Sequence, residues 1–203
     1  MTPAHDGARA APGIYWEPRV SAFVTQVRPG GFRVTRRADL ALVTLLGSCV
    51  AACICDPRAG VGGLNHFLLP DEGSAAAPAA DAARYGAQAM EMLIAEIVRR
   101  GGERSRLQAK LFGGAEVMAL PSASPVGKSN REFARGFLRR EGIPVTAADL
   151  GGTRARRVFF KPAADRVLVQ MLDHTGADRV RREEDRLRRR LFTAPASGGV
   201  TPL

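Results

Sequence analysis

The residues best suited to chemistry are a cysteine and a histidine that flank one expected β-hairpin. Cys49 follows Gly47 and Ser48, a glycine turn whose backbone amides can point at a developing oxyanion. His66 lies inside an apolar segment on the far side of the hairpin. A neighbouring imidazolium lowers the pKa of a cysteine and so favours the reactive thiolate. The pair predicts nucleophilic catalysis, in which Cys49 attacks a carbonyl and forms an acyl-enzyme.

The expected hairpin fixes the distance between these two side chains. Residues 50–55 and 61–69 are apolar runs, and residues 56–60 between them have the composition of a turn. Antiparallel pairing across this turn makes Cys49 a diagonal neighbour of His66, about 7 to 8 Å away at the backbone. Side chains can close such a gap. The sequence therefore places a thiol and an imidazole within reach of each other.

Two other interpretations of these residues stay open. Cysteine is among the most buried residue types, and a lone histidine in an apolar strand is often a hydrogen-bonded core residue. A zinc site is the second alternative, because Cys49, Cys53, Cys55 and His66 are four possible ligands. The cysteine spacing argues against zinc, since structural sites usually use paired C-x(2–4)-C knuckles on turns. We expect no metal and no cofactor.

Strand and helix patterns alternate through the middle of the chain. The expected strands are residues 40–46, 50–55, 61–69, 107–112, 143–150, 157–160 and 166–172, and the expected helices are residues 81–100 and 129–141. In the first helix, Gly86, Met90, Leu93, Ile94, Ile97 and Val98 are expected to share the buried face. Ser129 and Glu132 have the spacing of a capping box at the start of the second helix. Hairpins among these strands predict an α/β fold in the layered, α+β sense, with helices packed on mixed β-sheet.

Length and composition indicate one folded domain. The chain has 203 residues, of which 45% are apolar and 25% charged, as in ordinary globular proteins. Three cysteines, an odd number, and no secretory leader in the first 18 residues indicate a reducing compartment, hence the cytoplasm. No apolar run reaches the roughly 20 residues that cross a bilayer, so we expect no membrane insertion. The folded domain is expected over residues 20–178, after a mobile N-terminal extension at residues 1–19.

The positive charge is concentrated near the C-terminus. The net charge is +10, and residues 179–190 contain seven arginines against three acidic residues. We expect residues 179–203 to form a mobile, solvated tail, because few apolar side chains there could anchor a helix. Aromatic residues make up 6% of the chain and do not interleave with basic runs, which argues against nucleic-acid binding.

Several motifs between residues 34 and 172 resemble those of the CheD family of chemoreceptor glutamine deamidases. They are TLLGSCV at residues 44–50, GGLNHFLLP at residues 62–70, KLFGGA at residues 110–115 and DxGGxRxR at residues 149–156. The glycine-serine-cysteine segment followed by asparagine-histidine-phenylalanine at this distance is the most specific of them. The motifs also occur in the order expected for the family.

The resemblance implies an α/β sandwich and a protein-glutamine glutaminase that hydrolyses glutamine side chains on methyl-accepting chemoreceptors through a cysteine thioester. It makes Cys49 the nucleophile and His66 the general base and acid, while Thr44 completes the site and Gly47 and Ser48 support the oxyanion. The implied partners are receptor cytoplasmic helices and, in some members, the CheC phosphatase. Two other classes stay open: a non-catalytic chemotaxis binding module of the same fold, and a basic nucleic-acid-binding protein.

Overall fold

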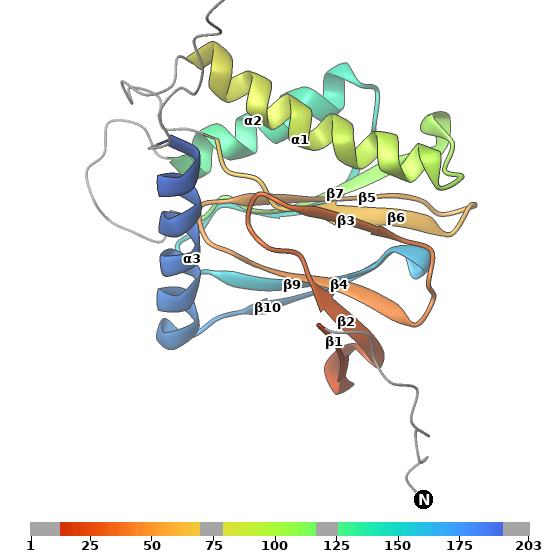
Figure 1. Ribbon diagram of the computed structural model, residues 1–203, viewed down its shortest axis with the longest axis horizontal. Helices are drawn as coiled ribbons and strands as arrows, with labels where there is room; N and C mark the ends of the chain where they lie inside the picture. The colour runs from red at the N-terminus through yellow and green to blue at the C-terminus, as the bar shows by residue number, and fades with distance from the viewer. Residues whose placement is uncertain (1–12, 70–78, 117–125, 193–203) are drawn as a thin grey trace, which may run out of the picture.

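The computed structural model describes residues 13–69, 79–116 and 126–192. They form two five-stranded sheets packed face to face, with two helices on one outer face and a third across the sheet ends (Figure 1). The first sheet consists, in spatial order, of β1 (Ile14–Glu17), β2 (Ala22–Gln26), β4 (Leu40–Leu46), β9 (Arg156–Lys161) and β10 (Arg166–Met171). The second consists of β3 (Phe32–Thr35), β6 (Val61–Asn65), β5 (Val50–Asp56), β7 (Gln108–Gly113) and β8 (Val145–Leu150). The helices are α1 (Ala79–Arg99), α2 (Val126–Arg140) and α3 (His174–Phe192), and short 3-10 helices lie at Pro18–Val20, Arg104–Arg106 and Pro162–Ala164.

Both sheets are mixed, as predicted. β2 pairs in parallel with β4, and β7 with β8, whereas the other neighbouring strands are antiparallel. In the predicted hairpin of β5 and β6, a further bridge between Val50 and Phe67 extends the pairing beyond the ends of the strands. This register makes Cys49 a diagonal neighbour of His66. The layered sandwich and the hairpin that carries both residues are therefore confirmed.

Two apolar layers stabilise the sandwich. The layer between the sheets contains Leu42, Leu46, Cys49, Ala51, Cys53, Cys55, Leu64, Leu68, Val158 and Phe160. The layer between the second sheet and helices α1 and α2 contains Val50, Ala52, Ile54, Met90, Leu93, Ile97, Phe137 and Leu138. Successive residues of β5 alternate between the layers, because side chains along a strand point to opposite faces. Both faces of β5 are covered, which explains why its sequence is apolar almost throughout.

The helices follow the predicted pattern with two exceptions. Gly101 adopts a left-handed φ of +92° just beyond the end of α1, as the predicted stop requires. Val98 was expected on the buried face of α1, but its side chain is 41% exposed because it lies at the edge of the apolar stripe. α2 begins at Val126, so Ser129 lies inside the helix and the predicted capping box is wrong. Among the described residues, no helix has the length and apolarity needed to cross a bilayer.

Both ends of the chain carry structure that the sequence analysis did not expect. Part of the expected N-terminal extension forms strand β1, which pairs with β2, and residues 1–12 lie outside the described residues. The expectation of a mobile, solvated tail after residue 178 is also wrong over the residues that the structure describes. Residues 179–192 belong to α3, where Val180 and Leu187 are buried against the sandwich. Residues 193–203 lie outside the described residues.

Candidate active site

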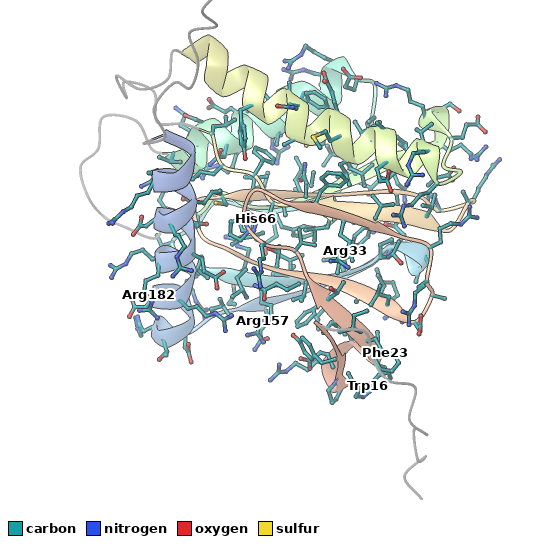
Figure 2. All side chains as sticks on the ribbon, in the orientation of Figure 1. Trp16, Phe23, Arg33, His66, Arg157 and Arg182 are labelled. Atoms are coloured by element: carbon teal, nitrogen blue, oxygen red, sulfur yellow. The ribbon has the colours of Figure 1, made fainter. Side chains whose placement is uncertain are left out.

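The segment that carries the predicted nucleophile connects the two sheets. β4 belongs to the first sheet and β5 to the second, so residues 47–49 cross from one to the other. Cys49 is fully buried, and His66, directly after β6, lies between the sheets near the end that α3 covers (Figure 2). The Cys49 sulfur, a ring nitrogen of His66 and a carboxylate oxygen of Glu184 all lie within 4.8 Å of one another. The structure thus brings the predicted thiol and imidazole together.

Thr44 determines which nitrogen of the His66 ring carries the proton. Its hydroxyl oxygen lies 2.8 Å from Nδ1 of His66 and 2.8 Å from the carbonyl oxygen of Val27. A carbonyl only accepts, so the Thr44 proton points to Val27 and Nδ1 of His66 must donate to Thr44. Nε2 then keeps its lone pair, and it is buried without a hydrogen-bond partner among the described residues. Nε2 is therefore the atom that can take a proton from Cys49.

The residues directly after β7 hold residues 47–49, which contain the predicted nucleophile, from one side. The backbone N–H of Gly114 donates to the Cys49 carbonyl at 2.7 Å, and that of Ala115 donates to the Gly47 carbonyl at 2.7 Å. Gly113 has a φ of +101°, and a Cβ there would lie 2.3 Å from the Cys49 carbonyl oxygen. Only glycine fits this position, both for its backbone conformation and for the close approach. The GG pair at residues 113–114 thus fixes the backbone beside the thiol.

Helix α2 holds the same segment from the other side through Asn130. The Asn130 side chain is fully buried; its Nδ2 donates to the Ser48 carbonyl at 2.9 Å, and its Oδ1 accepts from the Leu69 N–H at 2.8 Å. One amide thereby ties residues 47–49 to the chain that follows His66. The Asn130 side chain thus connects the backbone beside Cys49 to the backbone that follows His66.

The N–H groups of residues 47–49 converge on one acceptor, the carboxylate of Glu184 on α3. Glu184 Oε1 accepts from the N–H groups of Gly47 at 2.9 Å and Cys49 at 3.0 Å. Oε2 accepts from the Ser48 N–H at 3.0 Å and the Ser48 hydroxyl at 2.7 Å. The Glu184 side chain is itself buried. Converging backbone amides form a site for negative charge, which is the arrangement expected of an oxyanion hole.

Burial in this site favours the neutral forms of Cys49 and His66. Burial, together with the negative charge of Glu184 and a hydrogen bond to it, raises the pKa of the Cys49 thiol well above its usual value. Burial lowers the pKa of His66 to about 4, against the opposing effect of the Glu184 charge. The predicted thiolate and imidazolium are therefore not the state of this closed arrangement. With α3 in place, the structure pairs a thiol with a neutral imidazole.

Comparisons with known proteins agree with the motifs found in the sequence. Residues 68–171 match the family model described as CheD chemotactic sensory transduction. A protein of Xanthomonas campestris pv. campestris (strain B100), named probable chemoreceptor glutamine deamidase CheD, is 45% identical over 187 residues, which cover 92% of each chain. The chain belongs to the CheD family. A second CheD protein with the same name, from Caulobacter vibrioides (strain NA1000 / CB15N), is 50% identical over 156 residues, 77% of this chain and 80% of that one.

Among solved structures, Neisseria meningitidis protein NMB0706 covers 76% of this CheD chain and 77% of its own, with a TM-score of 0.46 and 13% identity. The two chains resemble each other only loosely. The match to the CheD family model begins after Cys49 and His66.

The four zinc ligands considered from the sequence do not come together among the described residues. Cys53 and Cys55 lie in the apolar layer further along β5, and the Cys55 thiol donates to the Asp165 carboxylate at 3.1 Å. The group that could hold a metal is instead Cys49, His66 and Glu184. Both Glu184 oxygens already accept hydrogen bonds from residues 47–49, and these would compete with a metal.

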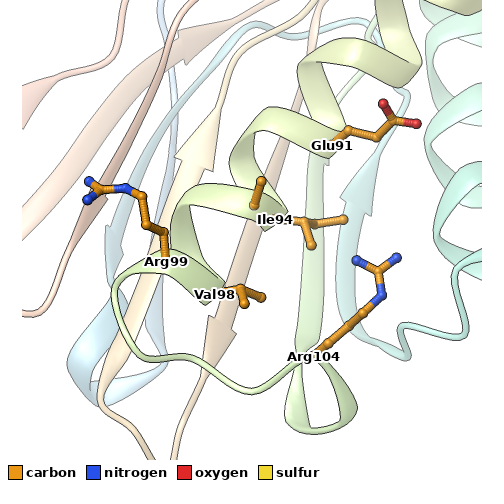
Figure 3. Close-up of a pocket in the computed structure, with 6 residues that line it drawn as sticks. Glu91, Ile94, Val98, Arg99 and Arg104 are labelled. Atoms are coloured by element: carbon orange, nitrogen blue, oxygen red, sulfur yellow. The ribbon is translucent and has the colours of Figure 1, made fainter.

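An open pocket elsewhere on the surface takes no part in this site. It has a volume of about 510 Å³ and lies beside the C-terminal half of α1 (Figure 3). Its lining is Glu91, Ile94, Ala95, Val98, Arg99 and Arg104. None of the residues proposed for chemistry lines it, so the catalytic hypothesis rests on the buried site between the sheets.

Sequence reasoning gave Asn130 no role and missed Glu184 altogether. Its signal was present, since Val180, Glu184 and Leu187 follow helical spacing and would share one face of a helix. The surrounding arginines outweighed this pattern in the sequence analysis, because a segment so rich in charge is typically solvated. The structure shows that this one face is buried while Arg181 and Arg182 remain exposed.

Proposed function

We propose that this chain is a chemoreceptor glutamine deamidase, a protein-glutamine glutaminase that converts glutamine side chains of methyl-accepting chemoreceptors to glutamate. One observation carries the proposal: a glutamate carboxylate, the chemical group that the reaction produces, lies beside the Cys49 thiol in a ring of backbone N–H donors. The names of the relatives from Xanthomonas and Caulobacter point to the same activity.

The first half of the reaction uses the His66 imidazole as a base. Nε2 of His66 takes the proton of the Cys49 thiol, and the sulfur forms a bond to the carboxamide carbon of the substrate. The carbonyl oxygen becomes negative in the position that Oε1 of Glu184 occupies, where the Gly47 and Cys49 N–H groups can stabilise it. The carbon–nitrogen bond then breaks, and His66 returns its proton to the departing ammonia. A thioester on Cys49 remains.

The second half is hydrolysis of that thioester. Water replaces ammonia beside His66, Nε2 takes one of its protons, and the oxygen forms a bond to the thioester carbon. The carbon–sulfur bond breaks, the thiolate leaves, and the proton on His66 returns the sulfur to a thiol. The substrate side chain is now a carboxylic acid, which releases the second proton of the water to solvent and becomes a carboxylate. Each such conversion adds one methyl-accepting site and one negative charge to a receptor helix, which would tune adaptation.

The partners that fit this activity are the cytoplasmic helices of chemoreceptors, and the CheC phosphatase is a further candidate. All three cysteines are free thiols, which suits the reducing cytoplasm. The net charge of +10 would speed the approach of acidic receptor helices, since electrostatic steering acts mainly on association rates. We therefore place the enzyme in the cytoplasm, acting on the receptor from that side.

Mass spectrometry of a receptor cytoplasmic fragment tests the proposal. The wild type should convert specific glutamines to glutamate, each gaining about 1 Da, and Cys49→Ala should abolish the conversion because the thioester cannot form. Cys53→Ala is the matched control: it removes another buried thiol and should lower stability by about 1 kcal/mol while activity persists. A chelator should leave the activity unchanged. Conversion by Cys49→Ala would overturn the mechanism, and receptor binding without conversion by the wild type would indicate the non-catalytic binding module.

A further inference from the structure

A side chain of helix α3, Glu184, occupies the position proposed for the substrate side chain. A glutamate side chain is what remains after a glutamine side chain loses its amide, and both have the same length. Glu184 places its carboxylate against the N–H groups of residues 47–49 and within 4.8 Å of the Cys49 sulfur and a His66 nitrogen. Cys49 has no exposed surface in this arrangement. The geometry is that of a bound reaction product, delivered on a helix.

We propose that α3 is an intramolecular product mimic that closes the active site, and that the surface beneath α3 is where a substrate helix docks in its place. The inference rests on the proposed deamidation and adds a specificity surface and an intrinsic inhibitor to it. The docking helix would present its glutamine where α3 presents Glu184. Docking of α3 and docking of a substrate helix are then mutually exclusive, and substrate can enter only after α3 has opened.

The contacts of α3 define what the docking helix must look like. Val180, four residues before Glu184, packs with Leu45 and Ala155 at the ends of first-sheet strands. Leu187, three residues after Glu184, enters the apolar layer between the sheets. Both are buried, at 2% and 4% exposure. The surface therefore selects a helix with aliphatic residues four positions before and three positions after the reactive glutamine.

Gly47 lets a helix approach this closely. A Cβ at Gly47 would lie 3.2 Å from a methyl group of Val180 and 3.1 Å from the Glu184 carboxylate. The residue that donates to Glu184 also leaves room for the side chains of a docked helix. The opposite face of α3, which includes Arg181, Arg182 and Arg186, is exposed. The sandwich therefore contacts one stripe of the helix, as expected for recognition of an amphipathic helix in a groove.

The short connection of α3 to β10 makes it a strong competitor. α3 begins at His174, three residues after β10 ends at Met171, so its local concentration is high. A substrate helix binds only the fraction of molecules in which α3 is displaced, and its apparent affinity falls by that fraction. Weakening α3 should therefore lower KM for receptor while leaving the chemistry of Cys49 and His66 in place.

The first test compares two neighbouring glutamates of α3. Glu184→Ala removes the carboxylate in the site, whereas Glu183→Ala removes the same charge from a side chain that is paired with Arg179 at 3.1 Å. Glu184→Ala should react with iodoacetamide at Cys49 about tenfold faster or more, and should show a lower KM for the receptor fragment, because the site opens more often. Glu183→Ala should match the wild type. Modification is assigned to Cys49 by peptide mapping, and thermal unfolding confirms that both variants remain folded. Equal alkylation rates in all three proteins would overturn the closure.

The second test uses the chain as its own substrate. Glu184→Gln places a carboxamide in the site, and attack by Cys49 with loss of ammonia and hydrolysis should restore glutamate at residue 184, a gain of about 1 Da. The double variant Cys49→Ala/Glu184→Gln should keep its amide, as should Glu183→Gln, whose glutamine lies outside the site. If Glu184→Gln keeps its amide in an enzyme whose wild type converts receptor glutamines, the product mimic is wrong and the deamidase stands. If the wild type converts no receptor glutamine, the proposed function fails, and the alkylation rates still decide whether α3 closes the site.

Discussion

One threonine hydroxyl determines what the His66 imidazole can do. Without the hydrogen bond from Nδ1 to Thr44, the ring could carry its proton on either nitrogen, and only one of these tautomers leaves Nε2 free to accept the Cys49 proton. Thr44 has no route to the substrate itself, since its hydroxyl is engaged by Val27 and His66. It is a positioning residue, and its effect should appear in the rate of the chemical step.

Substitution of Thr44 tests this role. Thr44→Val keeps the shape but leaves Nδ1 of His66 and the Val27 carbonyl without their partner, so kcat should fall by about 10- to 100-fold with little change in KM. Thr44→Ser retains the hydroxyl and should restore most of the activity. The pH dependence of kcat should also shift in Thr44→Val, because the imidazole loses the acceptor of its Nδ1–H. An unchanged kcat and pH profile would show that Thr44 is only part of the core.

At the scale of elements, the active site depends on a short crossing between two sheets that neighbouring elements hold rigid. Residues 47–49 form no regular structure, but the residues directly after β7 and Asn130 of α2 hold them on two sides. Their three N–H groups therefore converge on one carboxylate. Catalytic geometry of this kind needs support from rigid elements. In this chain, Asn130 provides that support from α2.

Asn130→Ala should therefore affect both stability and catalysis. It removes two hydrogen bonds from a fully buried side chain and leaves the Ser48 carbonyl and the Leu69 N–H unsatisfied, which should cost about 2 to 4 kcal/mol. The loosened amides of residues 47–49 should lower kcat as well. Ser129→Ala, one residue away on α2, is the control and should change stability by less than about 0.5 kcal/mol. Chemical denaturation and receptor deamidation measure the two effects; equal stability of both variants would contradict this role of Asn130.

The sequence predicted the elements whose periodicity is strong and missed those formed by tertiary contact. β4, β5 and α1 have long apolar patterns, and the hairpin register followed from one turn, so Cys49 and His66 could be placed together from sequence. β1, β2 and β3 are short, and β1 pairs only at the sheet edge, where the sequence carries little signal. α3 is buried along one narrow stripe within a run of arginines, and nothing local to that run indicates the N–H groups it meets. The donors to Glu184 lie 135 to 137 residues earlier in the chain.

At the scale of the whole molecule, α3 has an exposed basic face and a buried face that carries Glu184. The helix presents arginines to solvent and one carboxylate to the interior, so a segment that contributes to the basic surface also closes the end of the sandwich (Figure 1). Closure buries the Cys49 thiol and the His66 imidazole in surroundings that disfavour their charged forms. The folded state therefore resists protonation of His66, and this links the active site to global stability.

That link predicts a pH dependence of unfolding. The pKa of His66 falls from its ordinary value of 6.5 to about 4 on folding, mainly because of burial, so the unfolded chain binds a proton that the folded chain does not. Stability should therefore fall as the pH drops below 6.5 and level off, for this group, below about 4. Between pH 6.5 and 5, the wild type should lose about 1.5 kcal/mol that His66→Asn does not lose.

Denaturant titrations at several pH values measure this difference. The comparison uses slopes against pH, so it does not depend on how much the substitution itself destabilises the fold. His174→Asn, at the exposed start of α3, controls for the loss of a histidine elsewhere and should keep the wild-type slope. A wild-type slope in His66→Asn would show that the imidazole is not held neutral by burial, and the closed site would then have to be reconsidered around a charged His66.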